Sequence, residues 1–414
     1  MSEQKNNTPN LRFPEFTGEW EEKTLGEVAK KVNRKNTLLK VSRVLTNSAN
    51  LGVVDQGAYF DRDIAVKENT GNYSIVEIED FVYNPRISTA APVGPISINK
   101  VGQGIMSPLY TVFKFHTGCI SFYEQYFQTT IWHDYLKGIA NFGARFDRMN
   151  ITTEGFFNMP LYLPIDPTEQ EKIASCLSAM DELIAAQAEK VDALKEKKTG
   201  MMQQLFPRKG ETTPRLRFPE FTGEWEVKKL GEISPVIFDG THQTPHYVNN
   251  GIPFYSIENI VSDKPCKYIA QDEHMSNTRK NKTEKGDILI TRIGTIGFAK
   301  IVDWDGEFST YVSLATIKKS SLINTRYLLG YLQSEVYQKE MRSKSLMNAV
   351  PCKINMEDLK NTRIAVPKEQ QEQEKIASCL STLDDQIAAE TEKLTALKDY
   401  KKGLMQQLFP QPAK

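Results

Sequence analysis

QEKIASCLSAMDELIAAQAEKVDALKEKKTGMMQQLFP, residues 170–207, returns 203 positions later as QEKIASCLSTLDDQIAAETEKLTALKDYKKGLMQQLFP, residues 373–410. The two copies are identical at 26 of 38 positions. Neither copy contains a proline before its last residue, and the first glycines are Gly200 and Gly403, near the ends. Both copies are rich in Ala, Leu, Glu, Lys and Gln, which favour helices, so each predicts one long helix.

Apolar residues in each predicted helix recur with the seven-residue period of a coiled-coil seam. The seam and docking positions are Ile173, Leu177, Met180, Ile184, Gln187, Val191, Leu194 and Lys198 in the first copy, and Ile376, Leu380, Leu383, Ile387, Glu390, Leu394, Leu397 and Lys401 in the second. Polar residues interrupt both seams at equivalent places, and such residues can set the register of a coiled coil. We expect the two helices to pair antiparallel. The alternative is that each helix packs only on its own domain.

A second repeated block opens each half of the chain. LRFPEFTGEWEEKTLGE, residues 11–27, matches LRFPEFTGEWEVKKLGE, residues 216–232, at 15 of 17 positions. A unit this long is not a solenoid repeat and predicts a duplicated domain. The expected divisions are a disordered N-terminus 1–10, a first globular domain 11–165, a first helix 166–207, a linker 208–215, a second globular domain 216–368, a second helix 369–410 and a tail 411–414.

The regions between the repeated blocks differ almost completely between the two halves. β-like runs occupy 73–78, 109–115, 287–290 and 311–317, and helix-like stretches occupy 122–137 and 325–341. We predict an α/β (α+β) domain with a mixed sheet in each half. The predicted fold is therefore two similar globular domains separated by an antiparallel pair of long coiled-coil helices, related by a pseudo-two-fold internal duplication.

The composition is that of an ordinary soluble protein of 414 residues, with 40% hydrophobic and 25% charged residues. Lys plus Arg and Asp plus Glu both number 52, which argues against a general basic coat but permits a local basic cleft. The sequence has no apolar run of about 18 residues and no signal peptide, so we expect a cytoplasmic protein. Its five cysteines have no metal-binding spacing, and we predict no metal site.

Catalytic motifs are missing from the sequence. It contains no phosphate-binding GxxxxGK[ST] loop, no GxGxxG motif that opens a βαβ unit, and no HExxH. Asn84-Pro85-Arg86 lacks the Asn/Asp-Pro-Pro-Tyr/Phe motif of amino-methyltransferases. His242 and His246 have metal-like spacing, but they lie in a turn-rich loop without a third ligand. We therefore expect no catalytic residues and no bound cofactor in this chain.

Candidates for DNA recognition are easier to find. Basic segments at 30–43 and 277–285 suit phosphate contacts, although solvated basic loops are an equal alternative for each. Loops at 83–89, 141–148, 239–247 and 291–297 carry Arg, Asn and Thr side chains of the kind that read base edges, with ordinary turns as the alternative. The candidate DNA-binding residues are Lys31, Arg34, Lys35, Asn84, Arg86, Ser88, Thr89, Asn141, Arg145, Arg148, Thr241, His242, Thr244, Arg279, Lys280, Lys282, Arg292 and Thr295.

Duplicated ends with different middles indicate one scaffold that presents two binding surfaces. A helix of this length spans roughly 55 Å at 1.5 Å per residue. Equivalent helices that pair antiparallel would place the two surfaces in inverted orientation, as the two strands of duplex DNA are inverted.

The sequence resembles the specificity subunits of Type I restriction–modification systems. The resemblance extends from about Leu11 to Pro410, and its motifs are the two LRFPEFTGEW heads, DFVYNPRIST, DGTHQTPHYVNNGIPFYSIENI, GDILITRIGTIG and the two EQEKIASCL…MQQLFP helices. It implies two target recognition domains, each of which reads one half of a split DNA site, with the helices setting the gap. It assigns no individual base contacts, because the variable domains are where family members differ.

The resemblance also implies partners. The helices and flanking segments would dock two modification subunits, which carry S-adenosylmethionine and methylate adenine, and restriction subunits that use ATP and Mg would join this core. One alternative is a DNA-bridging or regulatory binding protein without methyltransferase partners. Another is a fused methyltransferase or nuclease with degenerate motifs.

Overall fold

The structure is a computed structural model, and it describes residues 7–59, 70–141, 147–262 and 264–410. The chain divides into two compact units. Unit 1 comprises Met1–Gln187 and Lys393–Lys414, and unit 2 comprises Ala188–Glu392. Each long helix therefore contributes one part to each unit.

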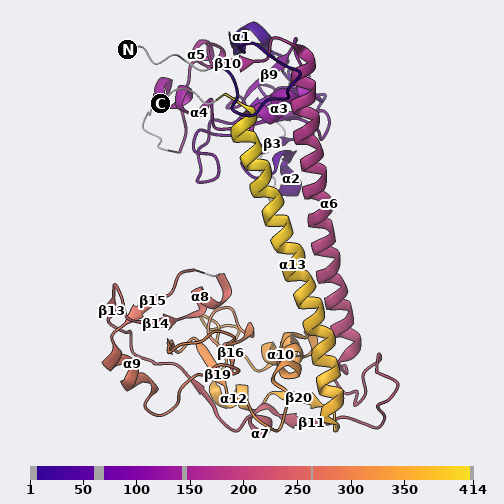
Figure 1. Cartoon of the computed structure of the whole chain (residues 1–414), viewed down its shortest axis with the longest axis vertical. Coiled ribbons are helices and arrows are strands. Elements are labelled where there is room, and N and C mark those ends of the chain that lie inside the picture. Colours follow the sequence, from indigo (N-terminus) through magenta and orange to yellow (C-terminus); the bar gives the residue numbers. More distant parts are fainter. Residues whose placement is uncertain (1–6, 60–69, 142–146, 263, 411–414) are drawn as a thin grey trace. The chain divides into compact units, whose positions relative to one another are not determined.

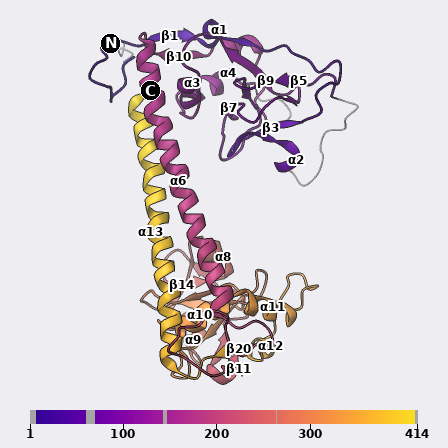
Figure 2. The ribbon, with the colours of Figure 1, turned by 90° about the vertical axis from the view of Figure 1, so that its right-hand side faces the viewer.

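The two repeated stretches form the long helices α6 (Pro167–Leu205) and α13 (Gln370–Leu408), of 39 residues each. In both units, part of α6 lies antiparallel beside part of α13 (Figure 1, Figure 2). All sixteen predicted seam residues are buried or half-buried. The predicted antiparallel pairing is confirmed, and the alternative of two separately packed helices is wrong.

Unit 1 contains small antiparallel sheets on one side of the helix pair. Its four-stranded sheet has the order β2 (Ala29–Lys31), β9 (Thr111–Phe115), β6 (Phe81–Tyr83) and β7 (Ile96–Ile98). Its two-stranded sheets are β1 (Glu21–Thr24) with β10 (Pro160–Leu163), β3 (Leu45–Ser48) with β4 (Gly52–Asp55), and β5 (Ser74–Val76) with β8 (Gly104–Met106). Its shorter helices are α1 (Leu25–Val28), α2 (Gln56–Tyr59), α3 (Ile120–Phe127), α4 (His133–Ile139) and α5 (Thr153–Phe157).

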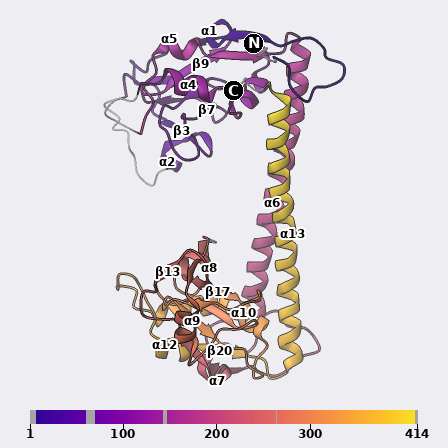
Figure 3. The same ribbon diagram turned by 60° about the vertical axis from the view of Figure 1, so that its left-hand side comes forward.

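Unit 2 has two four-stranded sheets (Figure 3). One is β12 (Ile237–Asp239), β19 (Leu314–Ile317), β16 (Ile288–Thr291) and β17 (Ala299–Ile301). The other is β13 (Tyr247–Val248), β15 (Lys267–Ile269), β14 (Ile252–Tyr255) and β18 (Ser309–Thr310), and β11 (Glu226–Lys229) pairs with β20 (Arg363–Val366). The shorter helices are α7 (Leu230–Ile233), α8 (Ile257–Ser262), α9 (Gln271–Thr278), α10 (Thr325–Gln333), α11 (Glu335–Ser343) and α12 (Met356–Lys360).

The structure corrects two details of the predicted domains. Instead of one mixed sheet, each unit has several small sheets, and among the described strands only β14 and β18 pair parallel. Each predicted helix in the variable regions is also two helices. At the break between α10 and α11, Ser334 has an extended backbone, and its hydroxyl accepts a hydrogen bond from the Tyr337 amide as the N-cap of α11. A local capping interaction therefore ends one apolar-periodic stretch and begins the next.

The C-terminal end of each long helix completes the core of the unit it reaches. The Phe409 ring, which follows α13, packs edge-to-face on Trp20 and Tyr126 in unit 1. In unit 2 the Phe206 ring, which follows α6, packs edge-to-face on Tyr327 and Tyr331. The repeated LFP ending is thus explained by burial, since a buried aromatic side chain contributes about 1.5–3 kcal/mol of transfer free energy. In the part of the chain that the structure describes, no helix is long and apolar enough to cross a membrane.

Candidate nucleic-acid interface

The repeated head segment fastens the two long helices together in unit 1. The guanidinium of Arg12 donates two hydrogen bonds of 2.8 Å to the buried carboxylate of Glu169 in the first turn of α6, and Trp20 Nε1 donates to the same carboxylate at 3.4 Å. The Leu11 amide donates to the carbonyl of Gln407 near the end of α13, at 3.0 Å. We call this arrangement the head clamp. In unit 2 the head clamp consists of Arg217, Glu372, Trp225, Leu216 and Gln204.

In unit 1, two candidate loops that are far apart in sequence lie together. The amide of Ile87 donates to the carbonyl of Asp147, and the amide of Met149 donates to that of Pro85, both at 3.0 Å. Arg86 and Arg148 face each other in an isolated bridge between these two segments. Their side chains lie 4.0 Å and 3.7 Å from one carboxylate, that of Asp147. Two arginines with one shared acid leave a net positive charge at this edge.

Among the other candidates of these loops, some side chains are hydrogen-bonded within the protein and others are exposed. The Asn84 amide group is engaged, because its Nδ2 donates to the Asn47 carbonyl at 2.9 Å and its Oδ1 accepts from the Arg86 amide at 3.0 Å. Gly94 lies against this turn with φ +79°, where a Cβ would meet the Asn84 carbonyl at 2.0 Å. The Ser88 hydroxyl accepts from the Ala91 amide. Thr89 and Asn141 are exposed. Arg145 lies outside the described residues.

In the first basic segment, residues 30–43, one candidate forms ion pairs within the protein and two candidates do not. Arg34 pairs with Glu77 at 2.7 Å and with the buried carboxylate of Asp80. Burial raises the pKa of Asp80, against the opposing effects of the Glu77 amide and of Arg34. Arg34 therefore stabilises the fold. Lys31 and Lys35 are exposed, and within the described residues their amino groups form no ion pair, so both can contact phosphates.

In unit 2, the loops at 239–247 and 291–297 also meet. Arg292 is 8% exposed, and its Nη1 donates to Asp239 Oδ2 at 2.9 Å and to the Val312 carbonyl at 3.1 Å. His242 Nε2 lies 2.9 Å from the same Asp239 oxygen. A buried guanidinium with these acceptors holds the loops together, so the structure does not present Arg292 to a base. Exposed His242, Thr244 and Thr295, together with half-buried Thr241, are the remaining candidates of these loops.

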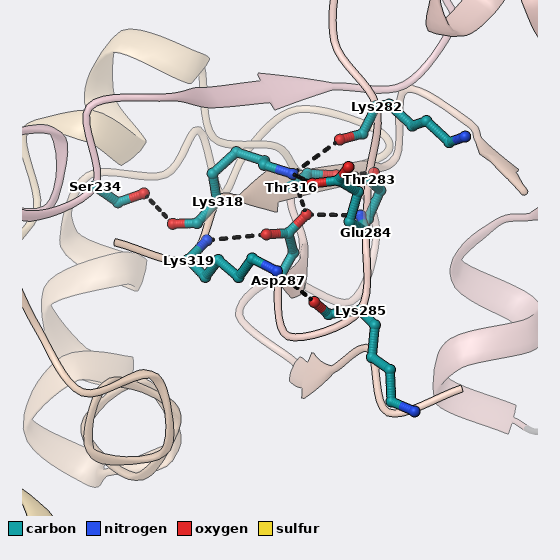
Figure 4. Close-up of polar contacts among 9 residues, drawn as sticks. All are labelled: Ser234, Lys282, Thr283, Glu284, Lys285, Asp287, Thr316, Lys318 and Lys319. Carbon is teal, nitrogen blue, oxygen red and sulfur yellow. Dashed lines mark hydrogen bonds and ion pairs between the residues drawn. The ribbon is translucent and has the colours of Figure 1, made fainter. Parts of the chain in front are cut away.

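The buried carboxylate of Asp287 holds the backbone next to the second basic segment, residues 277–285 (Figure 4). Asp287 Oδ2 accepts from the Glu284 amide at 2.7 Å and from Lys318 Nζ at 2.8 Å, and Oδ1 accepts from the Lys319 amide at 2.9 Å. Lys318 Nζ also donates to Glu284 Oε2 at 2.7 Å and to the Lys282 carbonyl at 3.1 Å. The hydrogen bond from Lys318 and then its positive charge lower the pKa of Glu284. These contacts hold the backbone that carries the basic side chains.

The lysines at the edge of this segment point away from Asp287 (Figure 4). Lys282 pairs with Glu307, and Lys285 pairs with Asp305 at 2.9 Å. Their charges are therefore partly neutralised. Two candidates are exposed and form no ion pair among the residues that the structure describes: Arg279 and Lys280.

The structure adds one further segment beside the candidate loops of unit 2, the loop 344–353. Its end is joined to the 291–297 loop, since the Gly294 amide donates to the Cys352 carbonyl at 2.8 Å and Ile293 bridges Lys353. The loop exposes Met347 and Val350, the latter fully. Its end corresponds to the segment from Asp147 in unit 1, where Arg148 likewise forms a bridge with Arg86. The signal in the sequence was apolar residues in a polar segment just after a predicted helix.

One serine–histidine–acid contact forms in unit 2. His274 Nδ1 lies 2.9 Å from Ser309 Oγ, and Nε2 lies 3.7 Å from Glu307 Oε2. Both Ser309 and His274 are buried, and burial lowers the pKa of His274. The hydroxyl is not accessible to a substrate, so these residues stabilise the packing of α9 on β18. Across the described residues, no three His, Cys, Asp or Glu side chains are placed to hold a metal ion.

These features define a class of protein with two different loop-bearing surfaces, each on a repeated helical clamp. The chain matches the Type I restriction modification DNA specificity domain twice, over residues 17–196 and 222–399, and it belongs to that family.

Two proteins of Methanocaldococcus jannaschii are similar in sequence. The Type I restriction enzyme MjaVIII specificity subunit is 26% identical over 261 residues, and the match covers 60% of this chain and 61% of that protein. The MjaIX specificity subunit is 25% identical over 340 residues, with 78% and 76% covered. The match thus spans about three fifths of the length of the MjaVIII protein.

Solved structures share the fold. A chain from a study of complex assembly and conformational transition of the type I R-M system has a TM-score of 0.59 at 16% identity, covering 94% of this chain and 97% of that chain. The Type-I restriction-modification system S subunit from M. genitalium has a TM-score of 0.55 at 15% identity, covering 97% and 99%. At these identities the similarity concerns the fold alone.

Proposed function

We propose that this chain is the non-catalytic, sequence-specific DNA-binding subunit of a cytoplasmic Type I restriction–modification complex. Each target recognition domain, 11–165 or 216–368, reads one half of a bipartite site, and the paired helices set the gap between the halves. The observation that carries this proposal is the contrast between identical head clamps and different loops. Identical head clamps with different loops suit two domains that each bind a different half-site sequence.

We assign phosphate contacts and base contacts to different side chains of these segments. Lys31, Lys35, Arg279 and Lys280 contact phosphates, which position a protein on DNA without reading its sequence. In this proposal Arg86 and Arg148 in unit 1 donate to guanine, and His242 and Thr295 in unit 2 contact base edges. Arg292 acts indirectly, by holding the loops that carry His242 and Thr295.

The proposed partners are two modification subunits, which bring S-adenosylmethionine and methylate adenine, and restriction subunits, which bring ATP and Mg. The seam residues are occupied by the helix pair itself, so docking uses the outer faces of the helices. Leu183 on α6 and Tyr400 on α13 are large exposed apolar residues on these faces. We propose that both side chains contact a modification subunit.

The test is a genome-wide map of methylated adenines in cells with and without this chain, with its modification subunit present in both. We expect one bipartite motif with a fixed gap to disappear when the chain is removed. An unchanged map would refute the proposal. Stable DNA binding by the isolated chain, with no modification subunit retained on co-purification, would favour a DNA-bridging protein instead.

A further inference from the structure

A buried lysine connects both long helices to the recognition domain in unit 1. The side chain of Lys401, at a seam position of α13, is 8% exposed. Its Nζ donates to Asp181 Oδ1 on α6 at 2.6 Å and to Gln128 Oε1, just after α3, at 2.9 Å. Gln125 Nε2 on α3 donates to the other oxygen of Asp181 at 2.9 Å. One ammonium group thus joins three segments of the chain.

The same arrangement recurs in unit 2 with the two helices exchanged. The side chain of Lys198 on α6 is 16% exposed, and its Nζ donates to Asp384 Oδ1 on α13 at 2.6 Å. It also donates to Gln333 Oε1, at the end of α10, at 3.3 Å. Lys198 and Lys401 are 203 residues apart, as are Asp181 and Asp384. We call these two groups the lysine clusters.

The heptad pattern makes these pairs specific to one register. Both lysines occupy position a, and both aspartates occupy position e of the facing helix. Moving the partner helix by one heptad in either direction would replace Asp384 by Ala377 or Thr391, and Asp181 by Ala174 or Ala188. An ammonium group in the seam would then lack its carboxylate, and a buried unpaired charge is costly. Leu and Ile positions of the seam penalise such a shift far less, because each would meet another apolar residue.

We propose that Lys198 and Lys401 are positioning residues that fix the helix register and the seat of each recognition domain on the helices, and so select the gap length of the DNA site. This proposal rests on the proposed function. Helix length alone sets an approximate distance, and the two ion pairs select one gap length within it. One heptad corresponds to about 10.5 Å along a helix, or roughly three base pairs of DNA.

The experiment uses the full chain with its modification subunits and measures methylation of oligonucleotides that carry both half-sites at different gaps. In the double variant Lys198→Met with Lys401→Met, we expect the same half-site sequences but a loss of about tenfold in the preference for the natural gap. The matched control is Lys190→Met. Its ion pair with Glu390 also joins the two helices, but the lysine side chain is 54% exposed, so the gap preference should stay unchanged.

A second variant tests the proposal by exchanging the lysine and the aspartate within each lysine cluster. Lys401→Asp with Asp181→Lys, combined with Lys198→Asp and Asp384→Lys, restores both pairs in reversed polarity, and we expect it to restore the gap preference. A methionine variant that methylates with unchanged gap preference overturns the proposal, even if its melting temperature falls, because the lysines would then act on stability alone. Failure of the charge exchange to restore the preference in a folded complex also overturns it. Wild-type protein that supports no bipartite methylation would instead refute the proposed function.

Discussion

The two units of this protein use the same clamp and different surfaces. Arg12 on Glu169 in unit 1 and Arg217 on Glu372 in unit 2 have the same pair of 2.8 Å hydrogen bonds, and each carboxylate is 1% exposed. The loops that project from the clamps share almost no sequence. Identity within the chain therefore marks the residues that hold the helices, while the loops differ between the two units.

A turn with a buried aspartate occurs in both units, with the same hydrogen bond but a different cation. Asp80 and Asp287 are both fully buried, and each accepts a hydrogen bond of 2.7 Å from the amide three residues earlier. Their cations differ in origin, because Arg34 precedes Asp80 in the sequence whereas Lys318 follows Asp287. The buried acid demands a cation, but the fold can supply it from either direction.

Breaking the head clamps should have the largest effect. Arg12→Ala and Arg217→Ala each leave a buried carboxylate without its bidentate partner, and we expect each to lower the free energy of unfolding of its own unit by about 3–5 kcal/mol. Denaturant unfolding of the single variants measures this. Lys172→Ala is the control, since its ion pair with Glu15 is exposed and should contribute about 1 kcal/mol or less. Unequal losses in the two units would contradict the equivalence of the clamps.

Substitutions in the loops should separate the two surfaces. Arg86→Ala should lower discrimination at one half-site by about 1–3 kcal/mol, and Thr295→Ala should weaken discrimination only at the other. The measurement is the methylated motif, determined separately for each variant. Arg208→Ala, in the exposed linker, is a control that should leave both half-sites unchanged. A change at both half-sites after either loop substitution would show that the surfaces are coupled.

Half-buried His133 in unit 1 and buried His274 in unit 2 should make the two units sensitive to acid. Burial, with a contribution from Lys137, lowers the pKa of His133 from 6.5 to about 4. Below about pH 6.5 the unfolded chain therefore binds a proton that folded unit 1 excludes, so stability falls as the pH falls from 6.5 toward 4. His133→Gln should reduce this loss in melting temperature between pH 7 and pH 5.

The matched variant His274→Gln addresses unit 2, because burial lowers the pKa of His274 as well. His116→Gln, at an exposed position, is the control. If acid sensitivity is the same in wild type, in His133→Gln and in His274→Gln, neither histidine is responsible.

The smallest effect on stability is expected at the 344–353 loop. Val350→Ser removes a fully exposed apolar side chain, so the free energy of unfolding should change by less than about 0.5 kcal/mol. DNA affinity should fall with little change in its dependence on salt, whereas Lys353→Ala should reduce the slope of that dependence by about 1. Binding titrations at several salt concentrations distinguish the two. Unchanged affinity in both variants would remove this loop from the interface.

Local patterns in the sequence predict which residues a helix buries, whereas contacts between distant segments do not follow from them. The seam residues from Ile173 to Lys198 could be assigned because a heptad repeat determines which side of a helix is buried. The residue type of Arg292 favours a base contact, but the sequence does not indicate that the side chain of Asp239 and the carbonyls of Val312 and Ile354 accept its hydrogen bonds after folding. The same limit applies to the 344–353 loop, whose position beside the 291–297 loop depends on the hydrogen bond between the Gly294 amide and the Cys352 carbonyl.

The sequence by itself determined the duplication, the two long helices and their antiparallel seam, because composition and periodicity act through neighbours along the chain. Only the tertiary structure decided that the end of each helix completes a core with the other half of the chain, and that Arg34 and Arg292 are held by buried acceptors. It also decided that Lys198 and Lys401 each meet an aspartate on the opposite helix. Those outcomes depend on which charged side chains become buried, since an unpaired charge is costly only there. In the lysine clusters the lysine side chains are 16% and 8% exposed, whereas those of Asp384 and Asp181 are 51% and 44% exposed.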